Sequence, residues 1–173
     1  MYEAAGGTVE LAMPTIARML LHADGSTTRL LEALLGQRVS LTLLEQQAAT
    51  AGALPLGVRA ALRCAAGTEV VCRRSQLRTG DGAVVSSNEV VVVCRDADIA
   101  ALLTGSALPI GHALAAARRH LGRVLLATGW DVWPLATDGV IRCAFKEYVL
   151  LDAASVPVAH IHERFNPVYV PVD

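Results

Sequence analysis

The stretch "TEVVCRRSQLRTGDGAVVSSNEVVVVC", residues 68–94, decides the fold. It contains two runs rich in β-branched residues, joined by Thr-Gly-Asp-Gly at residues 79–82. Glycine readily adopts the positive φ angles that tight turns need, so this pattern predicts a β-hairpin. An antiparallel sheet is therefore the expected framework of the domain.

The segments on both sides of the hairpin predict helices and further strands. Residues 13–36 have helical periodicity interrupted at a turn, after which Ser26 or Thr27 can cap a second helix that ends at Gly36. The remaining expectations are a half-buried strand at 38–46, short helices at 54–67 and 96–105, a loop and a long helix at 106–129, and paired strands at 140–151 and 158–170. Together they predict an α+β fold, a single domain of residues 1–173 with a mainly antiparallel sheet and flanking helices.

Composition limits the classes of function. Of the 173 residues, 53% are hydrophobic and 18% are charged, which is enough apolar material for one substantial core. Fifteen basic and sixteen acidic residues give a formal charge of −1, without the basic excess that binding to a phosphate backbone requires. The longest apolar runs have the length of strands. We therefore expect a cytoplasmic protein whose partners include neither nucleic acid nor a membrane.

Two charged residues have the same phase as the apolar residues of their strands. Arg73 alternates with Val71 and Leu77, and Glu163 alternates with Ile161 and Phe165. Both side chains are therefore predicted to point into the core, where an unpaired charge is costly. The sequence leaves three explanations open: a mutual ion pair, a polar cavity that receives a ligand, or a different phase of the strands.

The two histidines of the last strand fall on the opposite face from Glu163. His160 and His162 share that face with Arg164. A metal ion needs three or four ligands, and the other histidines lie in no supporting pattern. We expect a solvent-facing polar row at these positions and predict no metal site.

Four stretches carry a resemblance to a known family. They are "ADGSTTRLLEALLGQRVSLTLLEQQ" at 23–47, "RRSQLRTGDG" at 73–82, "LPIGHAL" at 108–114 and "VPVAHIHERFNPVY" at 156–169. In their order and spacing they resemble the chorismate pyruvate-lyase (4-hydroxybenzoate synthase) family, including its actinobacterial branch. The resemblance covers residues 15–170 and implies a chorismate lyase-like fold whose helices cover an internal ligand pocket.

The resemblance also implies an activity and a set of site residues. The expected enzyme is a carbon–oxygen lyase that eliminates pyruvate from chorismate to leave 4-hydroxybenzoate, without a metal or an organic cofactor. Arg73 would bind the ring carboxylate, with Arg74 as the alternative if the register differs by one residue, and Glu163 would be the acid. Backbone amides near Thr27, Ile110 and Gly111 would complete the binding of the substrate.

Departures from the family pattern keep other functions open. Asn88 stands beside Glu89 where the family often has a second basic residue, and Ser75 and Gln76 replace apolar residues after the arginine. A weaker positive field favours another substrate. The alternatives are a cyclase or isomerase of a specialised biosynthetic pathway, and a small-acid effector-binding protein of the same fold. In each case the expected partner is a small aromatic or cyclic carboxylic acid, and the oligomeric state is not predicted.

Overall fold

The predicted hairpin forms and lies within a six-stranded antiparallel sheet. The computed structural model describes residues 14–137 and 139–172. The sheet has the order β1-β2-β3-β6-β5-β4, in which every pair of neighbours is antiparallel. The strands are β1 (Ser40–Thr50), β2 (Glu69–Arg78), β3 (Val84–Val93), β4 (Gly122–Val132), β5 (Arg142–Leu151) and β6 (Pro157–Phe165). The α+β fold class is confirmed.

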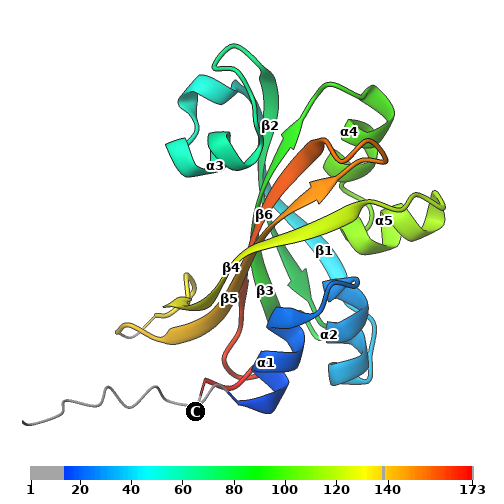
Figure 1. Cartoon of the computed structure of the whole chain (residues 1–173). Helices are drawn as coiled ribbons and strands as arrows, with labels where there is room; N and C mark the ends of the chain where they lie inside the picture. Colours follow the sequence, from blue (N-terminus) through cyan, green and yellow to red (C-terminus); the bar gives the residue numbers. More distant parts are fainter. Residues whose placement is uncertain (1–13, 138, 173) are drawn as a thin grey trace, which may run out of the picture.

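The helices gather around the sheet in three places (Figure 1). They are α1 (Thr15–His22), α2 (Thr27–Leu35), α3 (Leu56–Ala61), α4 (Ala97–Thr104) and α5 (Ile110–Ala116), with a 3-10 turn η1 (Ala51–Ala53) before α3. Helices α1 and α2 lie together below the sheet in this view, α4 and α5 lie beside each other, and α3 stands apart from them. No described helix is long and apolar enough to cross a membrane.

Capping residues fix the ends of helices α2 and α4. Ser26 is the N-cap of α2, and its side chain accepts a hydrogen bond from the Arg29 amide. Gly36 ends the same helix with a φ of 65°, a conformation that glycine adopts at little cost. Asp96 caps α4 by accepting hydrogen bonds from the amides of Asp98 and Ile99. Each cap lies next to an element that borders the site described below.

The long helix predicted for residues 106–129 is wrong. Helix α5 ends at Ala116, and the second half of this segment is strand β4. Arg118 has a φ of 52°, which an α-helix does not accommodate, so the chain turns there. Residues 122–132 then pair with β5 along their whole length, with one bulge between Leu125 and Ala127. Pairing with β5 therefore overrides the helical pattern of this segment.

Two apolar clusters form the core on the face of the sheet that the helices α1, α2, α4 and α5 cover. One cluster lies against α1 and α2 and includes Leu21, Leu31 and Phe165. The other lies against α4 and α5 and includes Leu103 and Ile161. A row of polar side chains lies between the two clusters.

Candidate functional site

A row of four buried polar side chains crosses the sheet between the two apolar clusters. The register places Ser75 of β2 beside Asn88 of β3, Asn88 beside Glu163 of β6, and Glu163 beside Lys146 of β5. We call these four residues the polar rung. None is more than 7% exposed. Because a buried polar group without a partner is costly, such a row requires partners from the helices or from a ligand.

A cavity of about 650 Å³ opens over this part of the sheet. The polar rung contributes three of its four members to the wall, and the neighbouring strand positions add Arg73, Tyr148 and Arg123. The opposite wall comes from the start of α2, from α5 and from the segment that follows α5, with Leu114 and Leu121 among its apolar members. A cavity of this size, which combines apolar side chains with convergent polar and charged groups, is typical of a small-molecule site.

Arg73 is the buried cation of this cavity. Its side chain is 2% exposed, and Nη1 donates a 2.7 Å hydrogen bond to the carbonyl of Leu103 at the end of α4. Nε and Nη2 are buried without a partner, and burial lowers the pKa of the guanidinium. Arg74, the alternative considered from the sequence, points to the other face and pairs with Glu45. The phase predicted for Arg73 is therefore confirmed.

Glu163 lies in the same cavity and is 7% exposed. Among the described residues, Glu163 forms no ion pair with Arg73. Of the explanations that the sequence left open for these two inward charges, the structure therefore favours a polar cavity and not a mutual ion pair. The phenol of Tyr148 hydrogen-bonds with the carboxylate, while Oε2 has no partner. Burial, reinforced by the charge of Glu163, raises the pKa of Tyr148 well above its ordinary value. The carboxylate therefore keeps one acceptor for something that enters the cavity.

Lys146 is the only lysine of the chain, and it is fully buried beneath the cavity. Nζ donates to the carbonyls of Leu20 at 3.2 Å and Ala23 at 3.5 Å, at the end of α1. Burial lowers its pKa to about 8, although the charge of Glu163 opposes this change. Lys146 thus connects the polar rung to the chain segment that begins the cavity wall at Asp24.

Thr27, Ile110 and Gly111 all line the cavity. Thr27 is the first residue of α2, and the other two begin α5. The two helices touch closely at Gly111, where an added Cβ atom would lie 2.3 Å from Oγ of Ser26 and 3.1 Å from Oγ1 of Thr28. The absence of a side chain at this glycine therefore sets the distance between the two helices that form the wall.

Gly111→Ala is expected to lower the free energy of unfolding by about 1 kcal/mol, the typical contribution of a helix cap, because the new methyl group displaces the Ser26 side chain. Gly57→Ala in α3 is the matched control, since no atom lies within 4 Å of its added Cβ. In the control variant the free energy of unfolding should stay at the wild-type value or rise, because alanine has a higher helix propensity than glycine. Urea unfolding of both variants tests this; equal effects would contradict a close contact at Gly111.

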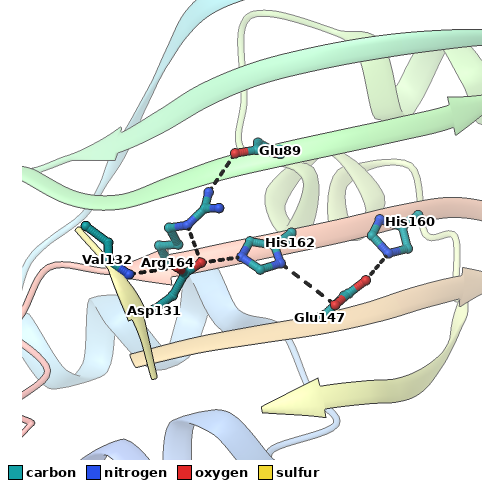
Figure 2. A network of polar contacts seen from close by, with 7 residues as sticks. All are labelled: Glu89, Asp131, Val132, Glu147, His160, His162 and Arg164. Carbon is teal, nitrogen blue, oxygen red and sulfur yellow. Dashed lines mark hydrogen bonds and ion pairs between the residues drawn. The ribbon is translucent and has the colours of Figure 1, made fainter. Parts of the chain in front are cut away.

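The opposite face of the sheet carries the histidines, but they do not form a solvent-facing row. His160 is 4% exposed, and its Nε2 lies 2.6 Å from Oε1 of Glu147. His162 is half-buried and contacts Asp131, which also accepts from Nε of Arg164 at 2.7 Å (Figure 2). The strand alternation was right and the expected exposure was wrong, because α3 and the side chains of neighbouring strands cover this face.

Two residues of the polar rung were missed by the sequence reasoning. Lys146 shares its face with Ala144, Tyr148 and Leu150, all buried. Asn88 was noted only as a departure from a family pattern, although it alternates with Ser86 and Val90. Arg73 and Glu163 were identified because each is a polar residue in phase with the apolar residues of its strand. The same criterion, applied to every strand, would have identified Lys146 and Asn88.

The fold is shared with domains of known structure that differ widely from this chain in sequence. The effector domain of PhnF from Mycobacterium smegmatis matches with a TM-score of 0.63 and 14% identity, over 82% of this chain and 88% of that one. The C-terminal domain of the histidine utilization repressor from Pseudomonas syringae pv. tomato matches with a TM-score of 0.60 and 13% identity, over 79% and 96%. A ligand-binding domain assigned to a GntR-family transcriptional regulator of Bordetella bronchiseptica matches with a TM-score of 0.56 and 16% identity, over 75% and 85%. No family model and no curated protein sequence matches the chain.

These matches correct the expected activity. The three neighbours are described as an effector domain, a ligand-binding domain of a transcriptional regulator and a domain of a repressor, which contradicts the prediction of a carbon–oxygen lyase acting on chorismate. The chorismate lyase-like architecture is confirmed only at the level of the fold, which such effector domains share. The prediction that nucleic acid is no partner also loses its support, since regulators of transcription are among the neighbours.

Proposed function

We propose that this chain is a small-molecule effector-binding domain that holds the acid group of its ligand on Arg73. The observation that carries the proposal is a guanidinium buried at 2% exposure in a cavity of about 650 Å³ with two donor atoms unpaired. A guanidinium presents a planar fork that matches a carboxylate or phosphate oxygen pair. An anionic ligand would satisfy both donors and offset the cost of the buried charge.

The charge around the cavity supports an anion. Among the described residues its wall contains five arginines, Arg29, Arg73, Arg118, Arg119 and Arg123, against the carboxylates of Asp24 and Glu163. Arg123 is held in place by the carbonyl of Gly25 and stacks over Tyr148 at 4.2 Å. Positive charge at the mouth of a cleft attracts anions and increases their rate of association.

The residues implied by the resemblance take binding roles in this proposal. Arg73 is the anion site, Glu163 accepts a hydrogen bond from the ligand, and Thr27, Ile110 and Gly111 form the wall that closes over it. The structural neighbours support this assignment, because one is described as an effector domain and another as the ligand-binding domain of a transcriptional regulator. The expected ligand is a small acid that is bound and released unchanged.

A panel of small carboxylic acids, each paired with its uncharged methyl ester, tests the proposal. Acids that bind should raise the midpoint of thermal unfolding in a concentration-dependent way, because ligand binding to the folded state stabilises it. The esters should have little effect, since they lack the charge that Arg73 recognises. The bound acid should be recovered chemically unchanged after incubation. Equal responses to acids and esters, or no response to any acid, would contradict an anion site.

A further inference from the structure

Two buried acceptor atoms of the cavity lack partners, and they belong to neighbouring residues. They are Oε2 of Glu163 and Oδ1 of Asn88. The two residues are directly paired between β6 and β3, so their Cβ atoms are about 5 Å apart. The amide nitrogen of Asn88 donates to Oγ of Ser86 at 3.2 Å, which leaves the carbonyl oxygen as its free atom. The cavity therefore presents two open acceptors together, one of them charged.

We propose that the ligand carries a protonated amino group beside its acid group, with the ammonium bound by Glu163 and Asn88 and the carboxylate bound by Arg73. An ammonium has three donors and a positive charge, so it can satisfy both acceptors at once. A hydroxyl has one donor and can satisfy only one of them. The charge of an ammonium also adds a Coulomb attraction to the Glu163 carboxylate, which a neutral hydroxyl does not provide. This inference rests on the proposed function and specifies the class of ligand.

The register places the anion site at a suitable distance from the two acceptors. Arg73 is the partner of Val90, which is two residues from Asn88 on the same face. Such diagonal positions in an antiparallel pair are about 7–8 Å apart, a distance that the long arginine side chain can shorten. The two charged groups of an α-amino acid are separated by one carbon atom. The cation on one strand and the acceptors on the next two strands thus match the charge pattern of an amino acid.

The cations nearest to Glu163 leave its open oxygen free. Lys146 directs Nζ to the carbonyls of Leu20 and Ala23 at the end of α1. Arg123 is engaged by the carbonyl of Gly25 and by Oγ1 of Thr27 at 3.4 Å. Since neither side chain forms an ion pair with the carboxylate among the described contacts, a cationic group of the ligand has a vacant position at Oε2.

Isothermal titration with matched ligands tests the inference. The probes are L-leucine, L-phenylalanine and L-glutamate, each with its α-hydroxy counterpart, its des-amino counterpart and its decarboxylated amine. For at least one skeleton we expect the amino acid to bind at least ~10-fold tighter than the hydroxy and des-amino acids, a ratio that corresponds to ~1.4 kcal/mol. The amines derived from leucine and phenylalanine should bind weakly, because they offer no carboxylate to Arg73; the amine derived from glutamate keeps its side-chain carboxylate and is left out of this comparison.

Glu163→Gln separates the role of the amino group from that of the acid group. In this variant the preference for the amino acid over the des-amino acid should fall to about one, while the des-amino acid keeps its affinity, because only the charge that faces the ammonium is lost. Glu89→Gln is the matched control, since Glu89 is exposed on the other face and pairs with Arg164. It should preserve the preference.

The outcomes of this experiment distinguish the two proposals. If the hydroxy and des-amino acids bind as tightly as the amino acids, or if Glu163→Gln leaves the preference intact, the inference about the amino group is overturned while the anion site remains. If no probe with a carboxylate binds, including the acids without an amino group, the proposed function itself is contradicted.

Discussion

Arg73→Met is expected to weaken acid binding by at least ~100-fold and, at the same time, to raise the free energy of unfolding. The loss of affinity follows from removing the only buried cation that points into the cavity among the described wall residues. Truncating one partner of a buried charged pair typically costs about 2–5 kcal/mol in binding, and ~2.7 kcal/mol corresponds to ~100-fold. Binding and stability are therefore expected to change in opposite directions.

The gain in stability follows from the state of Arg73 in the free protein. Its Nε and Nη2 have no partner, and one hydrogen bond to the carbonyl of Leu103 is its only described polar contact. Replacing buried charged groups with apolar residues of similar size is often stabilising by about 1–4 kcal/mol. Loss of the hydrogen bond to Leu103 offsets part of this gain, so we expect a rise of about 1 kcal/mol.

Arg74→Met is the matched control for this prediction. Arg74 is the next residue of β2, points to the opposite face and forms an exposed ion pair with Glu45. Exposed ion pairs contribute about 0–1 kcal/mol, so stability should change little and affinity should be retained. Titration calorimetry and urea unfolding of both variants provide the measurements. A destabilised Arg73→Met protein, or one that still binds acids, would show that Arg73 has a structural role instead.

The free energy of unfolding is expected to rise by as much as about 3 kcal/mol from pH 8 to 10.5 through the titration of Lys146. The folded-state pKa is about 8, against 10.5 for the ordinary side chain. Between these values the unfolded chain holds a proton that the folded protein has released. Because the unfolded state then binds more protons, stability increases with pH, and the full cost of the buried charge is present below pH 8.

Lys146→Met isolates this contribution. The difference in unfolding free energy between wild type and variant should change with pH in the interval from 8 to 9.5, whereas groups that both proteins share cancel. The difference is needed because burial also raises the pKa values of Tyr148 and Cys143, to about 11 for Cys143, so that these groups change the stability of each protein taken alone. Parallel curves for the two proteins would refute a depressed lysine pKa.

The composition of the chain offers a direct measurement of the same group. With a single lysine, ¹³C-lysine labelling gives one side-chain Cε signal in the NMR spectrum, and its titration reports Lys146 alone. We expect a midpoint of about 8 in the folded protein. A midpoint at the ordinary value of 10.5 would mean that the side chain reaches solvent.

The sequence predicted what depends on local chemistry or on alternation within one strand. Ser26 and Gly36 cap the two ends of α2 as expected, because caps act on the nearest backbone groups. Arg73 and Glu163 point inward because alternation is strict within a paired strand. Residues 117–129 were wrongly predicted as helix, since the pairing of β4 with β5 is a long-range interaction that local periodicity does not contain.

The site was predicted in its individual residues but not as an arrangement. The sequence indicated that Arg73 and Glu163 share one interior, and it left open whether they pair with each other. Their separation by strand β3, which places Asn88 between them, depends on the sheet order β2-β3-β6. The order of the strands thus determines whether Arg73 and Glu163 form an ion pair or face an open cavity. No local sequence pattern encodes this order.

The polar rung has a consequence for how the strands find their partners. A slip by two residues between β5 and β6 keeps every side chain on its own face, so hydrophobic patterning alone tolerates it. In the native register Lys146 lies beside Glu163, but after such a slip it would face Ile161 or Phe165. An ammonium without a neighbouring carboxylate would then be buried among apolar groups. The pairing of these two charges therefore makes the slipped register of β5 and β6 less stable than the native one, in addition to any role with a ligand.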